Sequence, residues 1–264
     1  MAQLVVHAGF HKTGTKSVQA CLAANAPLLA PQVRIYLKDD ILPLTKAARA
    51  YSVQRTAPAL AAVSRAAENF CSHIAAQGSQ NVVVSCEDLA GVMPGRRGVE
   101  SYAAVPMIMD VIAQAVRKHL GSTLDLTLVF TLRDPDSWLA SLWWQHLRST
   151  RYTLDARSHA RQMQEAADFE AIMAMTRKTV PEVQVVAAPL EEYRDLPHGP
   201  ATVLLDILEI PAEIQRDMER GAIENSRPAG KLEPVFLALN QSDLPNAVVT
   251  ETKKRLMRAA RRLR

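Results

Sequence analysis

Cysteine is scarce in this chain: of its 264 residues only Cys21, Cys71 and Cys86 are cysteine, and they stand far apart. Their number is odd, and their spacing fits neither a disulfide framework nor the paired ligands of a zinc site. We therefore expect a protein of a reducing compartment, the cytoplasm, that needs no metal.

Long apolar runs are also missing. No stretch approaches the roughly 20 apolar residues that cross a bilayer as a helix. The first residues pass directly into an apolar strand pattern, without the charged region, apolar core and cleavage site of a secretory signal. The sequence thus predicts neither a transmembrane segment nor secretion.

Neither sign of charge dominates, because 31 Lys and Arg stand against 27 Asp and Glu, which gives a net charge of +4. A basic excess this small favours a small anionic ligand over a nucleic-acid polymer. A chain of this length can bury one substantial core, so we expect one domain over residues 1–264. The most basic stretch, KKRLMRAARRLR, lies in an expected helical C-terminal tail at about 246–264, of unknown role.

Short apolar runs alternate with segments of helical periodicity along the chain. Runs without a polar alternation are typical of parallel strands buried on both faces. They occur at residues 4–6, 81–86, 125–132 and 183–188. Helical patterns follow at 101–120, after Pro135, at 159–178 and after Pro200, and the Ala-rich region 27–78 is expected to be mainly helical. The sequence predicts an α/β fold with a central, mostly parallel sheet flanked by helices.

The first strand leads into a loop rich in glycine, hydroxyls and lysine. Gly14 lets the backbone approach a ligand, and a helix beginning near Thr15 offers free N–H groups and the positive end of its dipole. Hydroxyls and ammonium groups gather there from Lys12, Thr13, Thr15, Lys16 and Ser17. This pattern predicts a site for phosphate or phosphosulfate. An ordinary capped strand–loop–helix with solvated lysines is the alternative.

The loop does not match the nucleotide-binding Walker A pattern. After Gly9 and Gly14 that pattern needs Lys at the next position, but Thr15 stands there and Lys16 comes one residue late.

A second candidate anion site follows the strand at 125–132. Arg133 stands at its end, and Ser141 lies two turns into a helix that begins at Pro135. The planar guanidinium of Arg suits a phosphate group. A surface Arg–Asp turn with a buried helical Ser is the alternative.

Two acids, Glu87 and Asp88, end the strand at 81–86. If the strands are parallel, these acids emerge beside the first loop, where Glu87 could accept a proton from a substrate. His11 borders the same loop and is the alternative base. The acids could also cap the next segment, or Asp88 could hold magnesium.

Three segments carry a resemblance to one family. HKTGTKS (11–17) resembles the 5′-phosphosulfate loop of sulfotransferases that use 3′-phosphoadenosine 5′-phosphosulfate (PAPS), with Lys16 in place of the family's second Thr. RDPDSWLASLWWQ (133–145) resembles its 3′-phosphate motif, and SCEDL (85–89) is similar to a Ser-Ser-Glu segment of its bacterial members.

The resemblance implies a P-loop NTPase-like sulfotransferase fold. PAPS would be the donor and 3′-phosphoadenosine 5′-phosphate (PAP) the product, with no metal and a small-molecule or saccharide hydroxyl, or an amine, as acceptor. Lys12 would stabilise the leaving group, with Glu87 or His11 as base. The implied nucleotide contacts are Lys12, Thr13, Gly14, Thr15, Lys16, Ser17, Arg133, Ser141 and, in a late loop that fits a plain turn equally well, Arg227, Gly230 and Lys231.

Two other functions remain open at this point. A kinase-like phosphotransferase would use ATP and magnesium on the same loop, with Asp88 as the magnesium ligand. A non-catalytic nucleotide-binding protein would keep both anion sites without a working base.

Overall fold

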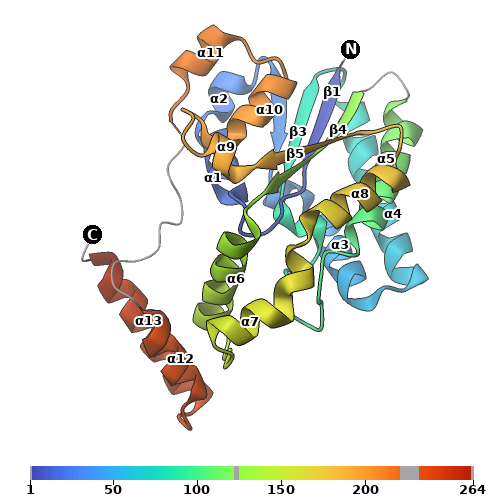
Figure 1. Ribbon diagram of the computed structural model, residues 1–264. Helices are drawn as coiled ribbons and strands as arrows, with labels where there is room; N and C mark the ends of the chain where they lie inside the picture. The colour runs from blue at the N-terminus through green and yellow to red at the C-terminus, as the bar shows by residue number, and fades with distance from the viewer. Residues whose placement is uncertain (1, 122–124, 221–231, 263–264) are drawn as a thin grey trace.

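A computed structural model describes residues 2–121, 125–220 and 232–262. Its centre is a five-stranded sheet in the order β2-β3-β1-β4-β5, in which every neighbouring pair is parallel (Figure 1). The strands are β1 (Gln3–His7), β2 (Val33–Tyr36), β3 (Asn81–Ser85), β4 (Asp125–Leu132) and β5 (Gln184–Pro189). The prediction of an α/β fold with a parallel sheet flanked by helices is confirmed.

The region 27–78 is mainly helical, as predicted, but it also contains the edge strand β2, which the sequence did not indicate. This strand has four residues and only Val33 is fully buried, so its strand character comes from pairing with β3. The helix expected over 159–178 is interrupted: it divides into α7 (Ala156–Met163), η3 (Gln164–Ala167) and α8 (Phe169–Thr179), with Asp168 capping α8 through the N–H of Ala171 at 2.9 Å.

Successive strand residues face opposite sides of the sheet, and each side has its own core. Leu4 and Val6 pack on one face, whereas Val5 packs on the other. The first face is covered by α3 (Leu42–Gln54), α4 (Ala57–Ala76), α5 (Val105–Leu120) and α8; the second by α1 (Thr15–Ala24), α2 (Ala26–Leu29) and α10 (Thr202–Ile207). Burial on both faces explains why the strands read as unbroken apolar runs.

The chain visits β2 and β3 on one side of β1 before it crosses to β4 and β5 on the other. The strand order therefore reverses at β1, and ligands of open parallel sheets bind beyond the carboxyl ends of the strands at such a point. The loop after β1, the short helix η2 (Glu87–Ala90) after β3 and α6 (Pro135–Ser149) after β4 all emerge at this edge. The remaining short helices are η1 (Lys38–Ile41), α9 (Leu190–Tyr193), η4 (Gly199–Ala201) and α11 (Ala212–Asp217).

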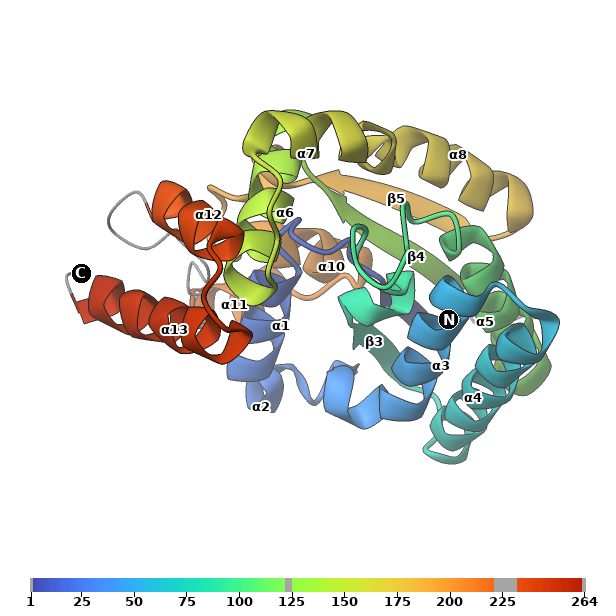
Figure 2. The ribbon, with the colours of Figure 1, turned by 90° about the horizontal axis from the view of Figure 1, so that it is seen from below.

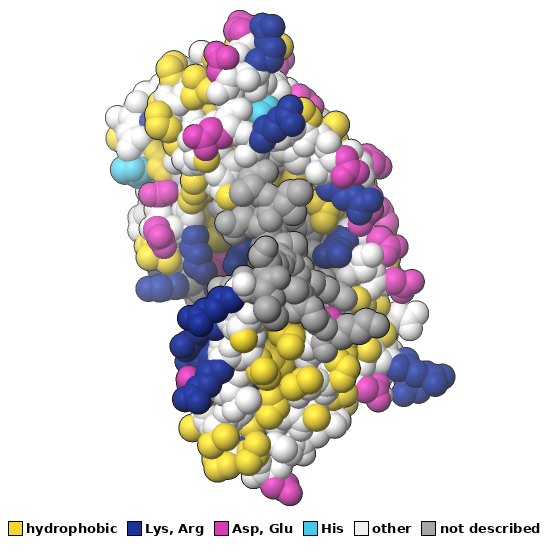
Figure 3. Space-filling view, turned by 90° about the vertical axis from the view of Figure 1, so that its left-hand side faces the viewer, with side chains coloured by type: hydrophobic (Ala, Val, Ile, Leu, Met, Phe, Trp, Pro, Cys, Tyr) yellow, Lys and Arg dark blue, Asp and Glu magenta, His cyan; other side chains and the backbone are white. Residues whose placement is uncertain are grey.

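The expected basic tail forms α13 (Asn246–Arg262), which follows α12 (Glu233–Gln241) in a hairpin beside α6 (Figure 2). The hairpin is docked: Phe236 packs on Trp144 and Leu147, and the buried Lys253 ammonium donates to the Leu147 carbonyl at 2.6 Å. Hydrophobic side chains with Lys and Arg beside them gather over the hairpin in the lower part of Figure 3. No helix within the described ranges is both long and apolar enough to cross a membrane.

Candidate functional site

The loop after β1 continues the sheet's hydrogen bonding and then turns sharply into α1. The N–H of Phe10 donates to the Thr131 carbonyl at 3.0 Å, which extends the β1–β4 pairing beyond the strand. Gly14 has φ 100°, and a β-carbon there would lie 2.9 Å from Leu190 Cδ1. The left-handed backbone favours glycine at this position, and any larger residue would also have to displace the Leu190 side chain. The helix begins at Thr15, as the sequence predicted.

The loop's threonine hydroxyls point inward. The Phe10 carbonyl accepts from Thr13 Oγ1 at 2.6 Å and from Thr15 Oγ1 at 3.0 Å, and both side chains are buried. These hydroxyls therefore fix the loop's shape. The N–H groups of Thr15 and Lys16, at the very start of α1, precede the first hydrogen bond of the helix and are the natural anion donors. Ser17 is half-buried in the same turn, with its N–H on the Gly14 carbonyl at 2.9 Å.

A buried polar network, which the sequence did not predict, connects the loop to the ends of β1, β3 and β4. His7 lies between Ser85 Oγ at 2.8 Å and Thr131 Oγ1 at 3.3 Å, and Thr131 Oγ1 also contacts Thr13 Oγ1 at 2.7 Å. Complete burial lowers the pKa of His7 to about 4, so the ring is neutral at neutral pH. The sequence feature that could have indicated this network is His7, a polar residue at the end of an otherwise apolar strand.

Lys12 lies within a group of positive charges, which we call the Lys12 cluster: Lys12, Lys16, Arg133 and Arg148. Burial, followed by the charges of Arg148, Lys16 and Arg133, lowers the pKa of Lys12 to about 8, and the charge of Glu87 only partly opposes this. Arg133 also donates to the Lys12 carbonyl at 3.3 Å. The two anion sites predicted separately therefore adjoin each other.

Two side chains fix the start of α6: Asp134 caps the helix, and Trp138 joins it to the loop after β1. The Asp134 carboxylate accepts from the Ser137 N–H at 2.9 Å and caps the helix, while the buried Trp138 indole donates to the His11 carbonyl at 2.9 Å. Trp138 is therefore a core residue. Ser141 is half-buried and shares a helix face, at intervals of four and seven residues, with Gln145 and Arg148. Arg148 donates to Gln145 Oε1 at 3.0 Å.

Glu87 lies beside the loop, because its Cα is 3.1 Å from where a β-carbon on Gly9 would be. The side chain is half-buried, and Oε2 accepts from Gln19 Nε2 of α1 at 2.8 Å. Glu87 thus reaches the same edge of the sheet as the Lys12 cluster. The predicted proximity of the β3 end and the first loop agrees with this geometry.

Asp88, next in the chain, is engaged elsewhere. It is buried and contacts Arg49 NH1 at 2.5 Å, Lys38 Nζ at 2.7 Å and His11 Nε2 at 3.5 Å. Burial alone would raise the pKa of Asp88, but the hydrogen bonds from His11 and Lys38 and the charge of Arg49 hold it well below its usual range. Among the described residues no group of three or more His, Cys, Asp or Glu could hold a metal ion.

His11 is held at both ring nitrogens. Nε2 faces Asp88 and Nδ1 lies 3.2 Å from the Tyr102 hydroxyl. Burial raises the pKa of Tyr102 well above its ordinary value, so this group is a phenol that can donate to Nδ1 while Nε2–H points to Asp88. Both ring nitrogens of His11 therefore have a partner within the protein.

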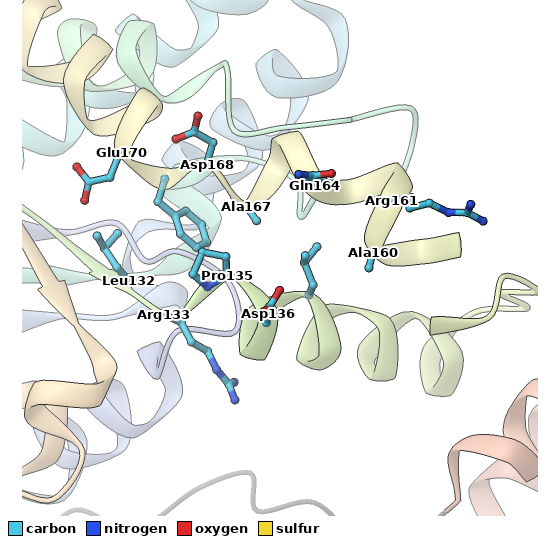
Figure 4. Close-up of a pocket in the computed structure, with 12 residues that line it drawn as sticks. Leu132, Arg133, Pro135, Asp136, Ala160, Arg161, Gln164, Ala167, Asp168 and Glu170 are labelled. Carbon is cyan, nitrogen blue, oxygen red and sulfur yellow. The ribbon is translucent and has the colours of Figure 1, made fainter. Parts of the chain in front are cut away.

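A separate cavity of about 620 Å³ lies on the other side of the start of α6, between that helix and α7, η3 and α8 (Figure 4). Arg133 forms part of its wall, but its guanidinium points away from the other lining residues. The cavity therefore does not coincide with the Lys12 cluster. The predicted contacts Arg227, Gly230 and Lys231 lie outside the described residues.

Comparisons with known proteins assign no family to the chain. No family model matches it, and no curated protein matches it. Among solved structures, an unliganded sugar kinase from Janibacter sp. HTCC2649 is similar, with a TM-score of 0.38, 12% sequence identity, and coverage of 81% of this chain and 98% of that chain.

Proposed function

We propose that this protein is a PAPS-dependent sulfotransferase. The observation that carries the proposal is the contact between the two candidate anion sites: Arg133, at the end of β4, donates to the carbonyl of Lys12 in the loop after β1. PAPS has an anionic group at each end of its ribose, and such a ligand needs two adjoining cationic sites. Lys12 with the start of α1 suits the 5′-phosphosulfate, and Arg133 with Ser141 suits the 3′-phosphate.

The charges of the site fit this ligand. Burial and the neighbouring positive charges both lower the pKa of Lys12, and an anion bound among the four cations would offset these unfavourable contributions. The Thr13 and Thr15 hydroxyls are used within the loop, so we assign the contacts of Thr13, Gly14, Thr15 and Lys16 to their backbone N–H groups. Contact through Ser17 stays a prediction.

The donor supplies the sulfuryl group, and residues of this chain would promote its in-line transfer. The acceptor oxygen forms a bond to sulfur while the bond between sulfur and the 5′-phosphate oxygen breaks. Lys12 stabilises the negative charge that develops on that oxygen. Glu87, oriented by Gln19, accepts the proton from the acceptor hydroxyl. No metal enters this scheme.

The phosphotransferase alternative loses its proposed magnesium ligand, because Asp88 is already paired with Lys38 and Arg49. Melting temperatures in the presence of PAP, and of ATP with magnesium, separate the two functions. We expect PAP to raise the melting temperature more. Turnover of PAPS in the presence of an acceptor then distinguishes an enzyme from a protein that only binds the nucleotide.

The decisive experiment is calorimetric titration of Arg133→Ala with PAP and with adenosine 5′-phosphate. Loss of a charge-assisted contact to the 3′-phosphate should weaken PAP by about 2–5 kcal/mol and leave the weaker binding of adenosine 5′-phosphate nearly unchanged. Arg161→Ala, an exposed position on α7, is the control and should bind both nucleotides like the wild type. An equal loss for both nucleotides, or a wild type without 3′-phosphate preference, would contradict the proposal.

A further inference from the structure

The cavity of about 620 Å³ at the start of α6 takes no part in the proposed reaction. It lies between α6 and the segment formed by α7, η3 and α8 (Figure 4), and sites for small molecules typically have volumes of about 300–1,000 Å³. Arg133 forms part of the wall, but its guanidinium points away from the other lining residues. The cavity is therefore separate from the anion site around Lys12 and is large enough for a ligand of its own.

The lining of the cavity is partly apolar. The apolar residues come from the end of β4, from α6 and from the segment α7–η3–α8, and they are Leu132, Pro135, Leu139, Ala160, Ala167 and Phe169. Leu132, Leu139 and Phe169 are buried and belong to the core on this face of the sheet. In Figure 4, Ala160 and Ala167 point toward α6, and their single methyl groups leave space between the helices. An apolar group of a ligand would leave water against these walls, which is the main source of affinity in sites of this kind.

The charged side chains of the lining leave an excess of negative charge. The acids are Asp136, Asp168 and Glu170, and the cations are Arg133 and Arg161, whose guanidinium groups both point away from the other lining residues in Figure 4. Neither Asp136 nor Glu170 forms an ion pair with another described residue, and Asp168 caps α8 through Oδ1 alone. The starts of α6 and α8 stabilise these carboxylates without a cation. Their negative charge is therefore available to a positively charged group of a ligand.

We propose that this cavity binds a small molecule that combines an apolar body with a positively charged amino group. The apolar walls hold the body, and the ammonium group donates charge-assisted hydrogen bonds to the carboxylates of the lining. The same carboxylates repel an anion, so the cavity selects against the nucleotide that we propose for Lys12 and Arg133. The amine is thus a ligand additional to the substrates, and its binding does not depend on the proposed sulfotransferase function.

The test is a ligand-detected NMR titration with three compounds: 4-phenylbutylamine, the uncharged 4-phenylbutanol of the same skeleton, and n-butylamine, which keeps the charge without the phenyl group. We expect 4-phenylbutylamine to bind about tenfold more tightly than the alcohol, because only the amine pairs with the carboxylates. It should also bind at least about tenfold more tightly than n-butylamine, which buries less apolar surface. Equal affinities for 4-phenylbutylamine and either of the other compounds, or no binding of any compound, overturn the proposal. The titration contains no nucleotide, so a failed proposal here leaves the proposed function untouched.

Exchange of two acids locates the ammonium group. The double variant Asp136→Asn/Glu170→Gln should lower the affinity for 4-phenylbutylamine to nearly that for the alcohol and leave the affinity for the alcohol unchanged. Glu165→Gln, which removes an exposed acid of η3 outside the lining, is the matched control and should bind the amine like the wild type. All three positions are exposed, so these variants should also melt like the wild type. Equal affinities of the double variant and the control for the amine contradict the assignment.

A larger side chain in the lining locates the apolar body. Ala160→Leu fills part of the cavity and should weaken 4-phenylbutylamine and the alcohol alike, each by about tenfold. Ala140→Leu, at an exposed position of α6 outside the lining, is its control and should bind both compounds like the wild type. Unchanged affinities in a folded Ala160→Leu place the compounds elsewhere and overturn the proposal. If Ala160→Leu does not fold, the exchange of the exposed acids still decides it.

Discussion

Nucleotide binding should draw a proton onto Lys12. In the ligand-free protein, burial and the charges of Arg148, Lys16 and Arg133 lower its pKa from 10.5 to about 8. A phosphate group among these cations adds an attraction that opposes both the cost of burial and the repulsion, so we expect the pKa of Lys12 to rise to its ordinary value in the complex. Above pH 8 the free protein has a largely neutral Lys12, and the complex has a charged one. The perturbation that removes this coupling is Lys12→Met, which keeps the aliphatic stem without the ammonium.

The magnitude follows from the two titration curves. If the pKa is about 8 in the free state and regains its ordinary value of about 10.5 in the complex, binding takes up about 0.1 proton at pH 7 and about 0.75 proton at pH 8.5. The affinity should therefore fall roughly 30-fold between about pH 7 and pH 9.5. The phosphate groups of the nucleotide contribute little in this range, because their second pKa is near 6.

The assay is titration calorimetry of PAP at pH 8.5 in buffers of different ionisation enthalpy, whose slope gives the number of protons taken up. The wild type should take up most of a proton and Lys12→Met close to none.

The free energy of unfolding provides a second measurement. One unit of pKa corresponds to about 1.4 kcal/mol, so the lowered pKa of Lys12 reduces the stability of the ligand-free protein by about 3 kcal/mol at pH 7. The unfolded state binds the extra proton between about pH 8 and 10.5, so wild-type stability should rise with pH there. Equal proton uptake by both proteins, or a much less stable Lys12→Met, would refute the reasoning.

Three further predictions follow from the same geometry. Glu87→Gln should keep PAP affinity and lose about two to four orders of magnitude in turnover, as expected for a lost general base; if activity survives and His11→Ala abolishes it, the base is His11. Acidification should destabilise the fold, because burial lowers the pKa of three histidines from 6.5 to about 4: His7, His146 and His159. As the pH falls, the unfolded state binds these protons before the folded state does. Denaturant unfolding should therefore show that each histidine lowers the free energy of unfolding by up to about 2 kcal/mol between about pH 7 and 5. A free energy of unfolding that does not change over this range would contradict the burial of neutral rings. Gly14→Ala should lower the free energy of unfolding by about 1 kcal/mol more than Gly98→Ala, because both have positive φ but only at Gly14 would the added methyl group meet side chains, Leu190 and Pro200; equal losses would mean that these contacts are unimportant.

The sequence by itself determined the features that depend on neighbouring residues. Unbroken apolar runs gave four of the five strands and their parallel arrangement, because strands buried on both faces have no polar side. The loop with Gly14 and the helix start at Thr15 were predicted from glycine and hydroxyl spacing alone. Strand ends indicated that the first loop, Glu87 and Arg133 share one edge of the sheet, since the carboxyl ends of parallel strands lie together.

Only the tertiary structure decided which side chains face one another. The edge strand at 33–36 exists because β3 supplies its hydrogen bonds, and a helical neighbourhood hides this from local patterns. The sequence leaves Asp88 as a possible magnesium ligand, but in the structure its carboxylate oxygens pair with Lys38 and Arg49, which are distant in the chain. Thr13 turns its hydroxyl inward because the Phe10 carbonyl is buried and needs a donor. Side-chain pairing is set by burial among residues far apart in sequence, so no local pattern records it.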